Sequence, residues 1–188
     1  MKNNMKTGVI LFIATSTTAF TTISEKNVDV EQSTITWKGY KVTGQHEGTI
    51  ELKEGTLLFE GNKLKGGSFI VDMASITNTD LEGEWKGKLE GHLKSDDFFG
   101  VEKHPTANLT ITKVEPNGDH YTVNGDLTIK DITNPITFEM TIDENSAKAS
   151  LNIDRSKFDV RYGSPSFFNN LKDKAIYDEF ELNVNLSF

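Results

Sequence analysis

The chain has 188 residues, of which 36% are apolar and 26% are charged, so it can bury a core and is not a wholly disordered chain. Its 20 Lys and Arg against 28 Asp and Glu give a formal charge of -8, which argues against a groove that follows nucleic-acid phosphates. The absence of cysteine excludes disulfides, thiol catalysis and thiolate metal sites.

The first residues have the order of a bacterial secretory signal. Lys2 and Lys6 precede an apolar stretch at residues 9–14, and small polar residues follow it. The stretch is shorter than the roughly 20 residues that cross a bilayer. We predict a signal peptide over residues 1–22, cleaved near Ala19, and an exported domain over residues 23–188, with a buried N-terminal strand as the alternative.

From residue 28 onward, apolar and polar residues alternate, which is typical of strands with one buried face. The clearest alternation lies in residues 121–129, 136–142, 147–153 and 180–188. Weaker candidate strands lie at residues 34–42, 49–52, 56–59, 67–72 and 107–114. A change of parity in the first of these predicts a bulge near Gly39.

Turn-forming residues separate these segments and indicate an antiparallel meander. They lie at residues 53–55, 61–62, 116–119, 131–135 and 143–145. Short antiparallel strands in this number hide an apolar face either by folding over one another or by closing into a barrel, and closure also removes exposed edges. We predict an all-β, antiparallel β-barrel of about eight strands, with one or two short helices near its ends.

Two stretches interrupt the alternation. Leu81, Trp85, Leu89 and Leu93 recur every four residues, which places them along one side of a helix. We expect this segment either to dock over a barrel end or to form a loose loop. Residues 158–177 are predicted to form a loop or a short helix.

The residues show no motif for a hydrolase, a phosphate-binding loop or a dinucleotide site. His46, His92, His104 and His120 are scattered without metal-ligand spacing, and the adjacent Asp96 and Asp97 are interpreted as turn residues. We therefore predict no catalytic residue, no metal site and no cofactor.

Aromatic residues are frequent on the apolar faces of the predicted strands and near the strand ends. Such residues fill a core or line a ligand pocket, and the pattern alone leaves both open. A small barrel of about eight strands is either filled by side chains or hollow enough to hold one small ligand.

Three segments resemble motifs of the YceI-like family, in the family's order. They are GGSFIVDMASI at residues 66–76, HLKSDDFF at residues 92–99 followed by HPTA at residues 104–107, and GDLTIKDITNPI at residues 125–136. The resemblance covers residues 28–188, and Asp131 stands where glycine is common in the family. It implies an extended, lipocalin-like barrel in the periplasm that binds a long isoprenoid or similar amphiphile, without established catalysis.

The faces assigned by parity, together with this resemblance, predict the residues that line a ligand tunnel. The wall candidates are Trp37, Phe69, Leu109, Ile111, Val123, Leu127, Phe138, Met140 and Leu182. Four further residues are expected to line or close one end: Trp85, Leu89, Phe98 and Phe99.

The resulting hypothesis is a periplasmic or secreted protein that sequesters or carries an isoprenoid or other long-chain lipid. The alternatives are a barrel enzyme, such as an isomerase or cyclase using His46, His92 or Asp97, and a filled barrel that binds other proteins. Transient membrane contact and a homodimer are compatible with the sequence, whereas nucleic acid is not an expected partner.

Overall fold

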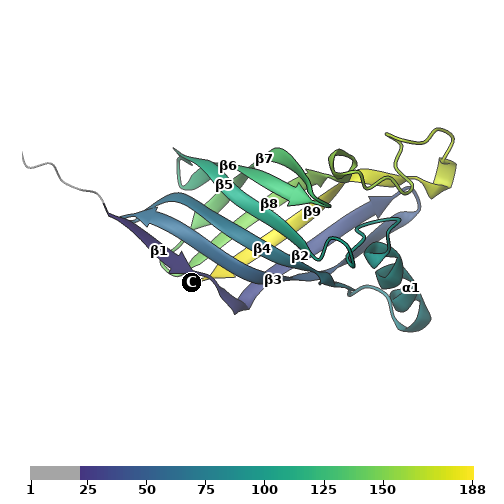
Figure 1. Cartoon of the computed structure of the whole chain (residues 1–188), viewed down its shortest axis with the longest axis horizontal. Coiled ribbons are helices and arrows are strands. Elements are labelled where there is room, and N and C mark those ends of the chain that lie inside the picture. The colour runs from purple at the N-terminus through teal and green to yellow at the C-terminus, as the bar shows by residue number, and fades with distance from the viewer. Residues whose placement is uncertain (1–21) are drawn as a thin grey trace, which may run out of the picture.

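The computed structural model describes residues 22–188, so the predicted signal peptide lies almost wholly outside the described residues. Nine strands and one α-helix make up most of this part (Figure 1). The strands are β1 (Ile23–Asn27), β2 (Asp29–Lys41), β3 (Gly44–Glu60), β4 (Lys63–Asn78), β5 (Thr106–Asn117), β6 (His120–Ile129), β7 (Ile132–Ile142), β8 (Ser146–Asp154) and β9 (Ile176–Ser187). The helix is α1 (Gly83–Lys94), and two short 3₁₀ turns, Arg155–Phe158 and Lys172–Lys174, lie between β8 and β9.

The strands form a closed antiparallel barrel. Strands β2 to β9 make a ring of eight, because β2 pairs with both β3 and β9, and β3 also pairs with β4. Strand β1 is additional and pairs with the C-terminal half of β3, continuing the line of β2 along it. This arrangement confirms the predicted fold class.

The predicted turn at residues 53–55 is wrong. The two short strands expected on either side of it are one 17-residue strand, β3, that passes through these residues without reversing. Its register with β4 shifts between Leu52 and Glu54, and the Gly55 carbonyl accepts a hydrogen bond from the Val28 N–H. Turn-forming residues are accommodated here as a β-bulge, which bends a strand without ending it.

The turn predicted at residues 131–135 is shorter than expected. Lys130 and Asp131 have φ values of 51° and 61°, which two-residue hairpin turns of type I′ require, and β7 begins at Ile132. Pro135 therefore lies within a strand, paired with Asp126 of β6. It is tolerated because the ladder between β7 and β8 runs over residues 139–142, so the missing N–H of Pro135 removes no bond from it.

The bulge predicted near Gly39 is confirmed, since the register between β2 and β9 shifts between Gly39 and Lys41. The predicted helix is also confirmed as α1. The connection from β4 to α1 is held by Asn78, a fully buried residue at the end of β4. The Asn78 N–H donates a hydrogen bond to Glu90 of α1. The Asn78 side chain donates to the Glu47 carbonyl and accepts from the Leu81 N–H.

The barrel has two different ends. One end, called the mouth end here, carries α1, the β6–β7 turn and the segment between β8 and β9, at the right of Figure 1. The opposite end, called the closed end, is filled by buried side chains from several strands. Those with the least exposure are Leu57, Phe59, Leu64, Val123 and Ala147. Among the helices formed by residues 22–188, none has the length and apolar character needed to cross a bilayer.

Close backbone approach at Gly48 yields the first test. A Cβ atom at Gly48 would overlap the Thr77 carbonyl oxygen and lie 2.8 Å from Cε2 of Trp37. We expect Gly48→Ala to lower the free energy of unfolding by about 2–4 kcal/mol, because two paired strands would have to separate. Denaturant unfolding followed by circular dichroism measures this.

Gly87 provides the matched control. It is exposed on α1 with no atom within 4 Å of its Cβ position, so Gly87→Ala should raise the free energy of unfolding by up to about 1 kcal/mol. Equal effects of the two substitutions would contradict the close approach at Gly48.

Candidate functional site: an apolar cavity in the barrel

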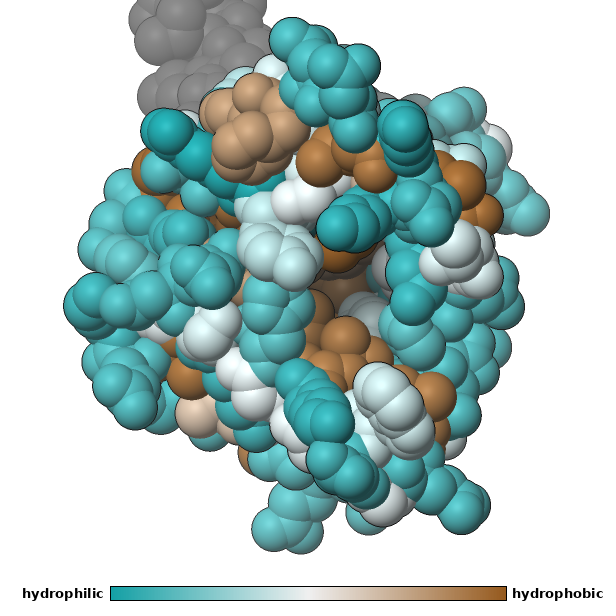
Figure 2. Space-filling view, turned by 90° about the vertical axis from the view of Figure 1, so that its right-hand side faces the viewer, coloured by the Kyte–Doolittle hydropathy of each residue, from teal (hydrophilic) through white to brown (hydrophobic). Residues whose placement is uncertain are grey.

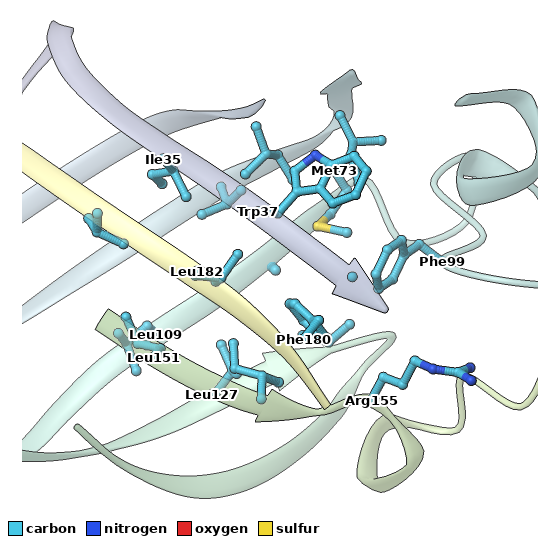
Figure 3. A pocket seen from close by; sticks show the side chains of 18 of the residues that line it. Ile35, Trp37, Met73, Phe99, Leu109, Leu127, Leu151, Arg155, Phe180 and Leu182 are labelled. Carbon is cyan, nitrogen blue, oxygen red and sulfur yellow. The ribbon is translucent and has the colours of Figure 1, made fainter. Parts of the chain in front are cut away.

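The inward faces of the strands enclose a cavity of about 170 Å³, well above the roughly 10–15 Å³ that one trapped water molecule needs. On β9 the lining residues run from Ile176 to Leu186, a distance of about 33 Å along the strand. The cavity is therefore elongated along the barrel. Figure 3 shows Trp37 of β2, Leu127 of β6, and Phe180 and Leu182 of β9 pointing into the same space.

Several inward-facing apolar side chains are only partly buried. Phe180, Leu182 and Val184 of β9 are of this kind, as are Val71 and Leu109. In a filled core such side chains would be inaccessible to water. Their partial exposure follows from the empty space beside them.

Nine of the thirteen predicted ligand-binding residues lie in the cavity wall: Trp37, Phe69, Phe98, Phe99, Leu109, Leu127, Phe138, Met140 and Leu182. Ile111 and Val123 face inward but are buried outside the cavity lining, in the packed part of the barrel. Leu89 is partly buried on α1, and Trp85 is 70% exposed. Contact of any of these residues with a ligand stays a prediction.

Further wall residues were not among those predicted. They include Ile35, Ile50, Met73, Ala149, Leu151, Ile153, Phe180, Val184 and Leu186. The last three share the alternating parity of Leu182, so the same pattern could have identified them. Met73 and Ile76 could not be found in this way, because they lie in a part of β4 whose register with β3 is shifted.

The cavity opens at the mouth end. Figure 2 shows a hollow in the middle of this face with apolar residues inside it and hydrophilic residues around much of its rim. Gly39, Tyr40 and Tyr177 belong to the lining at this end. The Tyr40 hydroxyl donates to Glu181 over 2.7 Å, and this hydrogen bond raises the pKa of the Tyr40 phenol above its usual value.

Arg155 is the one buried cation among residues 22–188 and lies where the wall meets the mouth. Its guanidinium donates to the carbonyl oxygens of Val160, Ile176 and Tyr177 over 2.8–3.1 Å. It also lies 3.4 Å from an Asp178 carboxylate oxygen. Burial lowers the pKa of the guanidinium, while the carboxylates of Asp178 and Asp154 oppose that effect.

Through these contacts, Arg155 anchors the segment between β8 and β9. Figure 3 shows its head directed away from the cavity interior. The guanidinium also lies 5.3 Å from the ring centre of Phe98, a wall residue. With its donors committed to the backbone, Arg155 positions the mouth, and only its stem contributes to the lining.

The four histidines do not converge. His46 pairs with Asp80 at 2.8 Å, His104 with Asp131 at 2.8 Å, and His120 with Asp119 and Glu139. Hydrogen bonds from the Glu47 N–H, His46 and Asn78 hold the pKa of Asp80 below its usual value, although burial acts in the opposite direction. Within the described part of the chain, no three His, Asp or Glu residues are grouped so as to hold a metal ion.

His92 differs from the other three histidines in its surroundings. Its ring packs edge-on against Tyr162, at 4.3 Å between ring centres, and against Phe98 at 5.7 Å. Its buried Nε2 atom has no hydrogen-bond partner in the described structure. Asp96 and Asp97 are exposed nearby, and Asp96 pairs with Lys103 at 2.5 Å. This pairing is consistent with a local structural role for Asp96.

Comparison with known proteins finds a family model described as "YceI-like domain" that matches residues 27–188. Protein YceI from Escherichia coli O157:H7 is 33% identical over 93 residues, which cover 49% of this chain and 46% of that protein. The match thus spans about half the length of this relative.

Solved structures share the fold at low sequence identity. The crystal structure of BcnA from Burkholderia cenocepacia has a TM-score of 0.65 at 22% identity, covering 85% of this chain and 98% of that one. A polyisoprenoid binding domain from Saccharophagus degradans, implicated in plant cell wall breakdown, has a TM-score of 0.59 at 11% identity. That match covers 88% of this chain and 97% of the other.

Two leucines test whether the barrel is hollow at one level and solid at another. Leu57 is completely buried at the closed end, and Leu57→Ala should lower the free energy of unfolding by about 3–4 kcal/mol. Leu182 already borders empty space, so Leu182→Ala should cost only about 1–2 kcal/mol. Equal losses in denaturant unfolding would mean that the interior is packed around Leu182.

The anchoring role of Arg155 is tested by removing the negative charge of its partner Asp178. Asp178→Asn leaves the buried guanidinium without its nearest carboxylate and should lower the free energy of unfolding by about 3 kcal/mol. The control is Asp159→Asn in the exposed pair with Arg161, with an expected loss below about 1 kcal/mol. Thermal and denaturant unfolding compare the two variants. Similar losses in the free energy of unfolding would contradict the anchoring role of Arg155.

Proposed function

Because the chain belongs to the YceI-like family, we propose that it is an exported carrier that holds an isoprenoid or other long-chain amphiphile in the barrel cavity. The observation that carries this proposal is the elongated apolar cavity with partly exposed side chains on its wall. The polyisoprenoid binding domain of similar fold adds support for a ligand of this chemistry.

The physical basis of binding is burial of the ligand's apolar chain. Moving apolar surface out of water contributes about 25 cal/mol per Å². A cavity without polar partners offers little to hold ordered water, so an apolar chain displaces little that is favourable. Affinity then depends on the length of chain buried, and the head group remains at the mouth.

Export to the periplasm is supported by the order of residues 1–22, with Lys2 and Lys6 ahead of an apolar stretch. A carrier is useful in such a compartment because an isoprenoid chain is insoluble in water. The protein then carries the apolar chain through water between two apolar environments.

We favour binding over catalysis because of where the proposed proton-handling groups lie. His46 is paired with Asp80 outside the cavity, and Asp97 is exposed to solvent. Neither of these residues nor His92 belongs to the cavity lining. The alternative of a filled barrel that binds other proteins is disfavoured by the cavity itself.

Trp37 provides a direct reporter of ligand entry. The chain has two tryptophans, so a Trp85→Phe background leaves only Trp37, which lines the cavity. We expect a long-chain polyprenol, added from an ethanol stock, to change the emission of Trp37 saturably. Solvent extraction of the purified protein followed by mass spectrometry should recover a co-purified lipid.

A pair of ring-adding substitutions on β9 supplies the control. Val184→Phe places a ring in the cavity and should weaken polyprenol binding roughly tenfold or more, because less apolar chain is buried. Asn185→Phe adds the same ring to the outer face and should leave binding unchanged. Failure of the unblocked protein to bind polyprenol or to yield any lipid would refute the carrier function.

A further inference from the structure

Exposed apolar side chains are distributed unevenly between the two ends of the barrel. Of the nine large apolar side chains that are exposed in residues 22–188, seven lie at the mouth end, and Ile23 and Val30 lie at the closed end. Four of the seven are aromatic residues that stand apart from the cavity wall: Trp85, Tyr162, Phe167 and Phe168. A surface of this kind marks an interaction site more often than a surface in contact only with water.

The aromatic residues come from two segments that flank the opening. Trp85 is on α1, and Phe167 and Phe168 are on the segment between β8 and β9, which extends beyond the barrel at the same end (Figure 1). Both segments are connected directly to residues of the cavity wall, through Leu93 of α1 and through Arg155. A partner bound here therefore lies next to the opening.

One segment of this surface carries more cations than carboxylates, unlike the whole chain. Residues 161–174 contain Arg161, Lys172 and Lys174 against the carboxylate of Asp173, although the chain carries a formal charge of -8. Arg161 is paired with Asp159 at 2.5 Å, so the cations of this segment that can meet a partner are the exposed Lys172 and Lys174. Two of the mouth-end cations lie over exposed rings. Arg161 is 5.1 Å from the ring centre of Phe167, and Lys88 is 4.9 Å from that of Trp85.

We propose that the mouth end docks on the surface of a lipid bilayer, with Trp85, Phe167 and Phe168 entering the interfacial region and with Lys172 and Lys174 facing anionic head groups. This inference rests on the proposed carrier function, and it specifies where the ligand enters. The cavity then opens toward the membrane, so an apolar chain passes from bilayer to barrel with little exposure to water.

The combination of residues favours a bilayer over a protein partner. Tryptophan and other aromatic side chains lie preferentially at the boundary between head groups and acyl chains, and lysine and arginine there interact with lipid phosphates. The attraction is local, because charges beyond about 10 Å are screened at ordinary ionic strength. The negative net charge of the whole chain therefore does not prevent contact at the mouth.

Vesicle sedimentation tests this surface with the full-length exported protein. We expect the protein to sediment with vesicles of phosphatidylethanolamine and phosphatidylglycerol, and, in a Trp37→Phe background, the emission of Trp85 to shift to shorter wavelength. Phe167→Ser/Phe168→Ser should weaken vesicle binding roughly tenfold or more, because both side chains lose their apolar insertion. Ile23→Ser/Val30→Ser removes two exposed apolar side chains from the closed end and should leave vesicle binding unchanged.

A charge-reversal variant provides a second test that does not depend on the folding of the phenylalanine variant. Lys172→Glu/Lys174→Glu changes two exposed side chains and should weaken binding to phosphatidylglycerol-containing vesicles, but much less to vesicles of phosphatidylcholine alone. No sedimentation of the unmodified protein with either kind of vesicle would overturn the proposal. Equal loss of binding in the closed-end variant would also overturn it.

Ligand transfer separates this inference from the carrier function. The Phe167→Ser/Phe168→Ser variant should bind polyprenol added from ethanol as tightly as the unmodified protein, but should take it up from vesicles several-fold more slowly. Polyprenol binding from ethanol without any vesicle binding would reject the docking surface and keep the carrier. Vesicle binding without polyprenol binding would reject the carrier. Capture of a soluble protein at this surface, with no vesicle binding, would identify a protein interface instead.

Discussion

Closure of the sheet through the ladder between β3 and β4 is the constraint on which the rest of the structure depends. It forces the apolar faces of eight strands to share one interior, and eight strands leave room for either packed side chains or a small ligand. The size of the inward side chains then decides the outcome at each level. Leu57 and Phe59 help to fill the closed end, whereas the wall of the cavity combines large side chains such as Phe138 with small residues such as Gly39 and Ala149.

Because the cavity lies beneath the mouth, the segments around the mouth lack apolar packing contacts on that side. The buried polar residues of the described chain are Asn78, Arg155 and Ser164, and all three lie at the mouth end. Asn78 connects the end of β4 to α1, and Arg155 connects β8 to the start of β9. Directional hydrogen bonds from these buried groups thus hold segments that a packed core would otherwise position.

The same end of the molecule combines the opening, the exposed aromatic residues and the exposed cations Lys172 and Lys174. Net charge does not describe this surface, because screening limits each charge to its own neighbourhood. A carrier of an insoluble chain needs a rigid container and a region that can meet an apolar source. The closed barrel provides the first, and we assign the second to the segments around its mouth.

The alternation of apolar and polar residues was sufficient to predict antiparallel strands, because a strand exposes its two faces at every second residue. Together with the family resemblance it also predicted a barrel and seven strand residues of the cavity wall, while Phe98 and Phe99 were expected near one end. It misjudged residues 53–55, since turn-forming residues also occur in bulges, and only the partners β1 and β4 keep β3 continuous there. The cavity itself could not be predicted in this way. Parity assigns a side chain to the interior of the barrel. Whether side chains fill that interior depends on the volumes of the residues that eight strands, distant in the sequence, place at the same height along the barrel. The tertiary structure alone decides this, and likewise brings Trp85 and Phe167 to one end of the barrel from segments about 80 residues apart in the sequence.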